Sequence, residues 1–279
     1  MLRRLAHALT IALPAWLATP AVAEPPARVV SMNVCTDQLA MLVARPGQLH
    51  SVSWLAADPA TSVLAGETDG LVLNHGLAEE IFLMRPELVI AGTYTTRTTV
   101  ALLERLGIPV AAFPPATSLD DIRANIVRMG ALLENERRSA ALVAAFDAER
   151  AALAARPASG RTLALYHANS YTSGAGTLAD AVVAASGLRH LGAEMGYSGT
   201  VKLPLEVLIA ADPDLVAGED GAAGQPARAH DAMRHPAYRA LADGGRGIAI
   251  DSRRWTCGAP FTLEAARRLA DDAEAAGDE

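Results

Sequence analysis

Aromatic and arginine side chains gather in the polar segments that follow the expected strands. Only 4% of the residues are aromatic, yet several of them lie in these segments, away from the apolar runs that build a core. Aromatic faces stack on flat conjugated groups, and guanidinium groups pair with anions. The pattern predicts a site for a flat, conjugated or anionic small molecule, although loop packing explains each residue taken alone. The candidate ligand-binding residues are Asn33, Cys35, Trp54, Tyr94, Arg97, Tyr171, Arg253, Arg254 and Trp255.

The motifs of common enzyme classes are missing from the sequence. We find no Gly-x-Gly-x-x-Gly after a strand, no Walker loop, no His-Glu-x-x-His and no Gly-x-Ser-x-Gly. The Gly-rich segment 173–176 lacks the spacing that cradles phosphate, and the 7 histidines are scattered without metal-site spacing. His167, at a strand end, is a candidate ligand or general base, but a hydrogen-bonded loop histidine explains it better. We therefore expect no catalysis, no cofactor and no metal site.

Short apolar strands alternate with helical stretches, which is the pattern of parallel βα units. In open sheets of this class, ligands bind outside the carboxyl ends of the strands, where the candidate residues lie. Strands are expected at residues 28–32, 49–54, 71–73, 88–91, 108–113, 162–167, 214–217 and 247–251. Helices are expected at residues 36–42, 78–84, 98–106, 118–133, 178–185, 233–241 and 262–275, and a polar loop at residues 168–177. Thr36 or Asp37 is expected to cap the first helix.

One sequence pattern occurs twice, at residues 79–90 and again at residues 206–217. Each copy has a glutamate, an apolar helical segment, a proline seven positions on, an acid and an apolar strand. The distance between the copies far exceeds the roughly 20–50 residues of a solenoid repeat. The repeat therefore predicts two similar α/β lobes with a cleft between them, and each lobe carries one glutamate at the start of a helix.

The longest helical stretch, residues 135–156, lies between the two copies of the repeat. Its apolar stripe consists of Leu142, Val143, Phe146 and Leu153. A surface helix of one domain would show the same stripe, but the position between the copies favours a rigid connector. We expect an N-terminal lobe at residues 24–134, the linking helix at 135–157 and a C-terminal lobe at 158–279. The fold class is thus α/β, with two Rossmann-like lobes built on mostly parallel sheets.

The N-terminal segment has the form of a cleaved secretory signal peptide, residues 1–23. Arg3 and Arg4 precede an apolar run, and Ala21-Val22-Ala23 has the small-x-small form of a cleavage site. A membrane anchor is the alternative, but the run is shorter than the roughly 20 apolar residues that a span needs. We expect a soluble protein in the periplasm. The net charge of −7 argues against nucleic acid as a partner.

Two cysteines, Cys35 and Cys257, lie near opposite ends of the expected mature chain. An exported protein with two thiols is a candidate for a disulfide. A buried pair of free thiols and a pair of soft metal ligands are the alternatives. The sequence favours a disulfide or a pair without metal, and leaves those two open.

An ordered set of motifs runs over residues 28–270: Arg28–Asn33, both copies of the repeat, the single helix after Ser139, Ser170–Thr177 and Trp255–Gly258. As a set, these motifs resemble the iron-complex and vitamin B12 periplasmic binding proteins of ABC importers. The resemblance implies two lobes joined by one long helix, modest closure on the ligand, and a monomer. It implies an iron chelate (siderophore or heme) as ligand, with cobalamin as the alternative, and a permease dimer with a separate ATPase as partners.

The resemblance also implies a role for the repeated glutamates. One glutamate of each lobe contacts arginines of the permease in such proteins, and the matching positions are Glu79 and Glu206, with Glu80 as a neighbour that could substitute. The alternative is that both acids only favour the helix dipole. A Cys35–Cys257 bond is not part of the resemblance, and it would tie the lobes together and restrict opening.

Three rival functions remain. A free zinc or manganese binder shares the long-helix plan, but it needs converging histidines and carboxylates, which the sequence lacks. An exported enzyme with a two-lobed cleft would lose turnover when one cleft acid or histidine is replaced. A sensor or scaffold would bind ligand and signal to a partner without transport.

Overall fold

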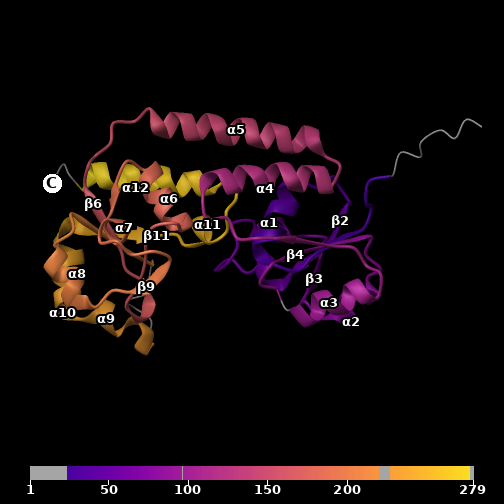
Figure 1. Ribbon diagram of the computed structural model, residues 1–279, viewed down its shortest axis with the longest axis horizontal. Helices are drawn as coiled ribbons and strands as arrows, with labels where there is room; N and C mark the ends of the chain where they lie inside the picture. The colour runs from indigo at the N-terminus through magenta and orange to yellow at the C-terminus, as the bar shows by residue number, and fades with distance from the viewer. Residues whose placement is uncertain (1–23, 96, 220–226, 277–279) are drawn as a thin grey trace, which may run out of the picture.

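Two α/β lobes lie side by side beneath one long helix, α5 (Glu136–Ala154), which runs along the top of both (Figure 1). The computed structural model describes residues 24–95, 97–219 and 227–276, so the expected leader at residues 1–23 lies outside it. The expected architecture of two lobes joined by a long helix is confirmed. Within the described residues, no helix combines the length and the apolar character needed to cross a membrane.

The N-terminal lobe is built on a parallel sheet with the strand order β3-β2-β1-β4-β5. Its strands are β1 (Val29–Ser31), β2 (Leu49–Ser53), β3 (Val72–Asn74), β4 (Leu88–Gly92) and β5 (Val110–Phe113). Its helices are α1 (Val34–Val43), α2 (Ala78–Leu83), α3 (Arg97–Arg105) and α4 (Leu119–Leu132). The strand order reverses between β1 and β4, and such a switch point opens a crevice at the carboxyl ends of the two strands.

The C-terminal lobe has a parallel sheet of order β11-β10-β6-β8 and a separate antiparallel pair, β7 and β9. Its strands are β6 (Thr162–Leu165), β7 (Tyr171–Ser173), β8 (Arg189–His190), β9 (Thr200–Lys202), β10 (Leu215–Glu219) and β11 (Gly247–Ile250). Its helices are α6 (Leu178–Ala185), α7 (Leu191–Glu194), α8 (Leu205–Ala211), α9 (Asp231–Arg234), α10 (Pro236–Leu241), α11 (Arg253–Thr256) and α12 (Thr262–Ala275). The expectation of a plain loop at residues 168–177 is wrong, because β7 lies there and pairs with β9.

One continuous hydrophobic core joins the two lobes. Ile126 of α4 and Phe146 of α5 belong to the same buried cluster as Val182 of α6 and Leu269 of α12. These helices pack together at the junction below α5 (Figure 1). The lobes are therefore connected by packed helices as well as by the chain that runs through α5.

The chain returns to the N-terminal lobe after β11 and makes a second connection. Ala259 and Phe261 are buried with Leu64 of the N-terminal lobe. Gly258 fits against α4 so closely that an added Cβ would lie 2.4 Å from the Cβ of Ala116 and 2.9 Å from Cγ1 of Ile122. Residues 253–261 thus fasten the C-terminal half of the chain to the N-terminal lobe.

The repeat found in the sequence folds in the same way in both lobes. The residue before the repeated proline takes a left-handed backbone conformation each time, with φ of 53° at Arg85 and 42° at Asp212. The repeated acid then holds the start of the lobe's first strand. Glu87 accepts a hydrogen bond from the backbone N–H of Ala27 at 2.6 Å, and Asp214 accepts one from the N–H of Thr162 at 2.7 Å. The proline–acid half of the repeat therefore has a structural role, because it fixes the chain at the start of each lobe.

Candidate functional site

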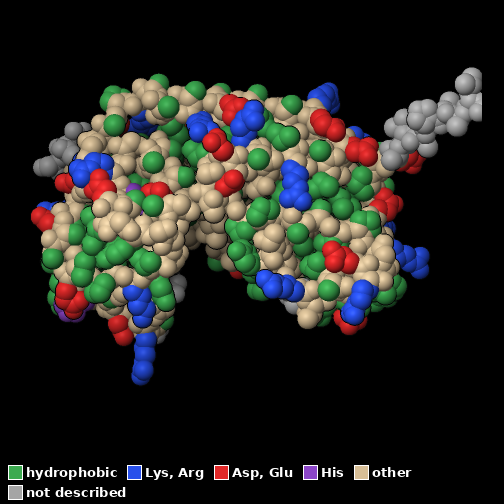
Figure 2. Space-filling model, in the orientation of Figure 1, with side chains coloured by type: hydrophobic (Ala, Val, Ile, Leu, Met, Phe, Trp, Pro, Cys, Tyr) green, Lys and Arg blue, Asp and Glu red, His purple; other side chains and the backbone are tan. Residues whose placement is uncertain are grey.

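The molecule is hollowed between the two lobes on the side opposite α5 (Figure 2). A cavity of about 110 Å³ opens there at the carboxyl ends of β1, β4 and β5, as expected for the switch point of a doubly wound sheet. The residues that line it are Asn33, Cys35, Thr36, Leu39, Gly92, Thr93, Tyr94, Phe113, Pro114, Pro115, Ala116, Asn125, Thr256 and Gly258. The structure thus brings Asn33, Cys35 and Tyr94 of the candidate set together in one pocket.

Asn33 shapes the floor of this cavity because it begins α1. Its side-chain oxygen accepts a hydrogen bond from the backbone N–H of Cys35 at 3.0 Å, which satisfies one of the free donors at the helix start. The expectation that Thr36 or Asp37 caps this helix is wrong. Gly92 lies against Asn33, and an added Cβ would approach the Asn33 amide to 3.3 Å.

Asp37 lies beneath the cleft floor and fixes the end of β2. One of its carboxylate oxygens accepts hydrogen bonds from both the backbone N–H and the hydroxyl of Ser53. Burial raises the pKa of Asp37 from 3.8 to about 6, and these hydrogen bonds act in the opposite direction. Since Ser53 directly precedes the short 3-10 helix Trp54–Ala57, this buried carboxylate positions the helix whose first residue carries the exposed indole.

Exposed aromatic rings lie at strand ends in both lobes. Trp54 follows β2 and Tyr94 follows β4, and 83% of the Tyr94 surface is exposed. Tyr171 begins β7 in the C-terminal lobe and is also exposed. The ammonium group of Lys202 lies 5.9 Å from the centre of the Tyr171 ring, within the range of a cation–π contact. These rings are not needed by the core, as expected from the sequence.

The arginines of the candidate set fall into two groups. Arg97, the first residue of α3, is exposed. Arg253 instead binds both oxygens of Asp251, at 2.7 and 2.8 Å, and donates to the Pro59 carbonyl of the other lobe at 2.9 Å. Arg254 pairs with Asp251 and Glu264. The charges of Arg253 and Arg254 are therefore already compensated within the protein, and the Arg253 guanidinium holds the pKa of Asp251 below its usual range.

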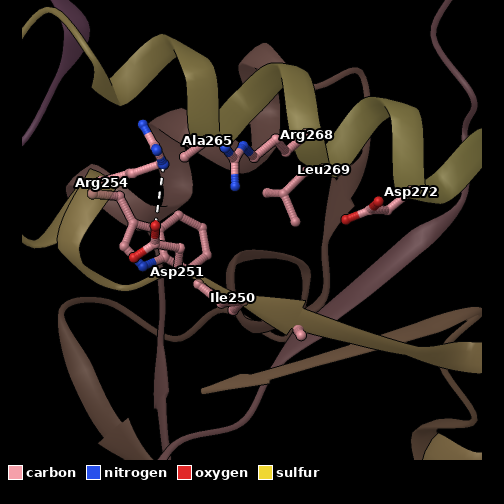
Figure 3. A pocket seen from close by; sticks show the side chains of 9 residues that line it. Ile250, Asp251, Arg254, Ala265, Arg268, Leu269 and Asp272 are labelled. Atoms are coloured by element: carbon pink, nitrogen blue, oxygen red, sulfur yellow. Dashed lines mark hydrogen bonds and ion pairs between the residues drawn. The ribbon is translucent and has the colours of Figure 1, made fainter. Parts of the chain in front are cut away.

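Trp255 differs from the expectation, because it is part of the core. It lies in α11 rather than in a loop, only 7% of its surface is exposed, and it packs in the central cluster. Together with Arg254 it lines a separate cavity of about 380 Å³. Figure 3 shows that Arg268, Leu269 and Asp272 reach into this cavity from one helix, α12, towards Ile250 of β11. All lining residues belong to the C-terminal segment, so this cavity is distinct from the interlobe pocket.

Cys35 and Cys257 form a disulfide between the start of α1 and the segment that follows α11. The sequence had left this pairing open. Because Cys35 also lines the interlobe cavity, the bond forms part of its wall. No group of three or more His, Cys, Asp or Glu side chains that could hold a metal ion occurs among the residues that the structure describes.

The repeated glutamates, Glu79 and Glu206, are exposed on α2 and α8. In Figure 1, α2 lies at the end of the N-terminal lobe away from α5, and α8 lies on the outer flank of the C-terminal lobe. Glu80 instead accepts a hydrogen bond from the backbone N–H of His75 at 2.7 Å and closes the turn before α2. Between the two neighbours, Glu79 is the one that matches Glu206 in position and exposure.

Comparisons with known proteins agree with this geometry. Residues 30–244 match the family model described as periplasmic binding protein. A cobalamin-binding protein of Halobacterium salinarum is 29% identical over 196 residues, which are 68% of this chain and 53% of that protein. The chain thus spans about half the length of this curated relative.

Solved structures show the same fold at low sequence identity. The periplasmic heme-binding protein RhuT from Roseiflexus sp. RS-1 superposes with a TM-score of 0.72 at 22% identity, over 89% of this chain and 98% of that one. The periplasmic vitamin B12 binding protein BtuF of Vibrio cholerae superposes with a TM-score of 0.69 at 18% identity, over 91% and 99% of the two chains. These likenesses establish the two-lobed fold.

Proposed function

The chain belongs to the periplasmic binding protein family, and from this premise we propose that it is the substrate-binding component of an ABC importer. It captures an iron chelate, a siderophore or heme, in the cleft between its lobes and delivers it to a permease dimer in the inner membrane. A separate ATPase supplies the energy, and the protein itself catalyses nothing. It acts as a soluble monomer after its signal peptide, residues 1–23, is removed. Residues 24–134 and 158–279 form the lobes and residues 135–157 the link.

The observation that carries this proposal is that exposed aromatic rings lie at strand ends in both lobes, with Tyr94 lining the interlobe pocket. Trp54 and Tyr94 follow strands of one lobe, and Tyr171 begins a strand of the other. Rings offered from both lobes suit a flat conjugated ligand or a chelate with aromatic groups. Asn33 and Cys35 line the same pocket as Tyr94.

The candidate arginines differ in how available their charges are to an anionic ligand. Arg97 is exposed and Lys202 lies beside Tyr171, whereas Arg253 and Arg254 are engaged by Asp251 and Glu264. We therefore assign contacts with anionic groups of the ligand to Arg97 and give Arg253 and Arg254 a structural role. Trp255, which is buried, is not included in the proposed site.

Cobalamin is the second candidate in the same class. The curated relative from Halobacterium salinarum is named a cobalamin-binding protein, and a corrin ring is also flat and conjugated. Because Arg253 and Arg254 are already paired with Asp251 and Glu264, they offer no charge to the carboxylates of heme, which favours a ligand with fewer peripheral anions.

Quenching of tryptophan fluorescence distinguishes these ligands. The mature chain contains Trp54 and Trp255, and a Trp54→Phe variant reports how much of the signal comes from the exposed indole. Heme, cobalamin, a ferric hydroxamate and a ferric catecholate are titrated in turn. Saturable one-to-one quenching by one ligand, lost mainly in Trp54→Phe, is expected. No saturable response to any of the four would overturn the proposal.

A further inference from the structure

The two helices that carry Glu79 and Glu206 also expose an apolar side chain at the same repeat position. Phe82 follows Glu79 by three residues, and Ile209 follows Glu206 by three, so each pair lies on one face of its helix. Phe82 is 48% exposed and Ile209 is 37% exposed. The residues just before them, Ile81 and Leu208, are fully buried. The helices are therefore packed alike, and each presents an acid beside an apolar group to solvent.

The N-terminal lobe has the larger apolar surface at this place. Leu83, beside Phe82, is 77% exposed, and Leu77 at the start of α2 is also exposed. Val72 and Leu73, in the strand that leads towards α2, are exposed as well. The C-terminal lobe has Ala210 where the N-terminal lobe has Leu83. Adjacent exposed apolar groups of this kind mark interaction sites on soluble proteins.

In Figure 1, α2 lies at the end of the N-terminal lobe away from α5 and α8 lies on the outer flank of the C-terminal lobe, so a partner that contacts both helices must span the two lobes. Such a partner must offer the same features twice, a basic group for the acid and an apolar recess for the side chain beside it. A two-fold symmetric membrane protein meets this requirement. A net charge of −7 disfavours an anionic lipid surface as the partner.

We propose that Phe82, Leu83 and Ile209 complete a two-part docking surface for the permease dimer, in which Glu79 and Glu206 supply the charge and these side chains supply apolar contact. This proposal rests on the proposed function as an importer component. Since the N-terminal lobe offers more apolar area, its half of the surface contributes the larger share of the binding. The acids set the register, and the apolar groups lengthen the lifetime of the complex.

Photocrosslinking in intact cells identifies the partner. The variants Phe82→p-benzoylphenylalanine and Ile209→p-benzoylphenylalanine are compared with Val127→p-benzoylphenylalanine, whose site on α4 is 49% exposed and lies outside the proposed surface. Crosslinks from residues 82 and 209, but not from 127, to a multispan importer permease are expected. Crosslinks to lipid alone, or equal yields from all three sites, would overturn the proposal.

The Kd for the identified permease–ATPase complex in lipid nanodiscs measures how much the apolar side chains contribute to docking. With ligand-free protein, Phe82→Ser combined with Leu83→Ser should raise the Kd at least tenfold and Ile209→Ser about threefold, while Val127→Ser should leave it unchanged. Melting temperatures equal to the wild type confirm that the variants are folded. A Kd within twofold of the wild type for the Phe82→Ser, Leu83→Ser variant would contradict the proposal.

The glutamates provide the comparison that separates this inference from the proposed function. If Glu79→Ala with Glu206→Ala abolishes binding and the apolar variants do not alter it, the importer role stands and the apolar contact is refuted. If neither set of changes weakens binding to the permease complex, the docking role within the proposed function fails too. Binding of the wild type to nanodiscs that contain lipid only would assign the apolar surface to the membrane and refute the permease as its partner.

Discussion

Cys35 and Cys257 are joined by a disulfide, and their Cα atoms lie 4.9 Å apart although 222 positions separate them in the chain. Cys35 begins α1 at the cleft floor, and Cys257 belongs to the segment that returns from the C-terminal lobe. The bond lies near Gly258, which is packed against α4. A covalent link at this second connection limits how far the lobes can separate, and it agrees with the modest closure expected of the family.

Removal of this bond is expected to destabilise the protein. Replacement of both cysteines, Cys35→Ser with Cys257→Ser, should lower the free energy of unfolding by about 2–4 kcal/mol, because the unfolded chain regains the entropy of a long closed loop. Urea denaturation of the wild type and the double variant measures the difference. Reductant should shift the wild-type midpoint towards that of the variant and leave the variant unchanged. Equal midpoints without reductant would show that the bond does not stabilise the fold.

The two tryptophans of the mature chain should respond in opposite ways to replacement. Trp54→Ala should weaken ligand binding at least tenfold with little change in stability, because its ring is exposed just after the carboxyl end of β2. Trp255→Ala should lower the free energy of unfolding by about 3–5 kcal/mol, since it opens a hole in the central core. Titration of the ligand and urea denaturation of each variant check both statements. A stable Trp255→Ala protein with lost ligand binding would instead restore Trp255 to the site.

The buried carboxylate of Asp37 makes stability depend on pH. Its pKa is about 6 in the folded protein against an ordinary value of 3.8, so the folded protein binds one more proton between these pH values. The free energy of unfolding should therefore fall as the pH rises from about 4 to about 6, by up to about 3 kcal/mol from this group.

Asp37→Asn isolates this contribution, because the amide oxygen can still accept from Ser53 while the charge is gone. As the pH rises from about 4 to about 6, the free energy of unfolding of the wild type should fall relative to that of Asp37→Asn. The exposed carboxylate of Asp120 provides the control, and Asp120→Asn should parallel the wild type. A difference between wild type and Asp37→Asn that is constant with pH would contradict the assignment.

The two repeated glutamates are expected to serve transport and not ligand capture. Glu79→Ala with Glu206→Ala should leave ligand affinity unchanged and reduce uptake of the ligand into cells at least tenfold, because charge-assisted contacts with the permease are lost. Glu80→Ala, which removes the hydrogen bond to the His75 backbone, is the matched control and should retain most of the uptake. Normal uptake by the double variant would refute the docking role.

The sequence predicted the parts of the fold that depend on local pattern. The alternation of strands and helices, the repeat and the long helix led to the two lobes, and the bounds of α6 and α12 agree with the expected ranges. The structural role of the repeated acid could not be predicted from the sequence, because the hydrogen bonds of Glu87 and Asp214 join residues that are far apart in the chain.

The candidate site was predicted in outline and not in detail. Residues such as Tyr94 lie at strand ends, and this position follows from topology alone. The burial of Trp255 and the ion pairs of Arg253 and Arg254 depend on how α11 and α12 pack. A polar sequence around an aromatic residue does not reveal that packing. The pairing of Cys35 with Cys257 likewise depends on the return of the chain to the N-terminal lobe.

Calorimetric titration of the purified protein with the chelate that quenches its fluorescence tests whether the ligand binds in the interlobe cleft. We expect binding of one chelate per protein, weakened at least tenfold by Tyr94→Ala with Trp54→Ala and by Tyr171→Ala, but unchanged by Arg268→Ala in the separate C-terminal cavity. Affinity that is retained in the variants with these cleft replacements and lost in Arg268→Ala would place the ligand in the C-terminal cavity and contradict binding in the interlobe cleft.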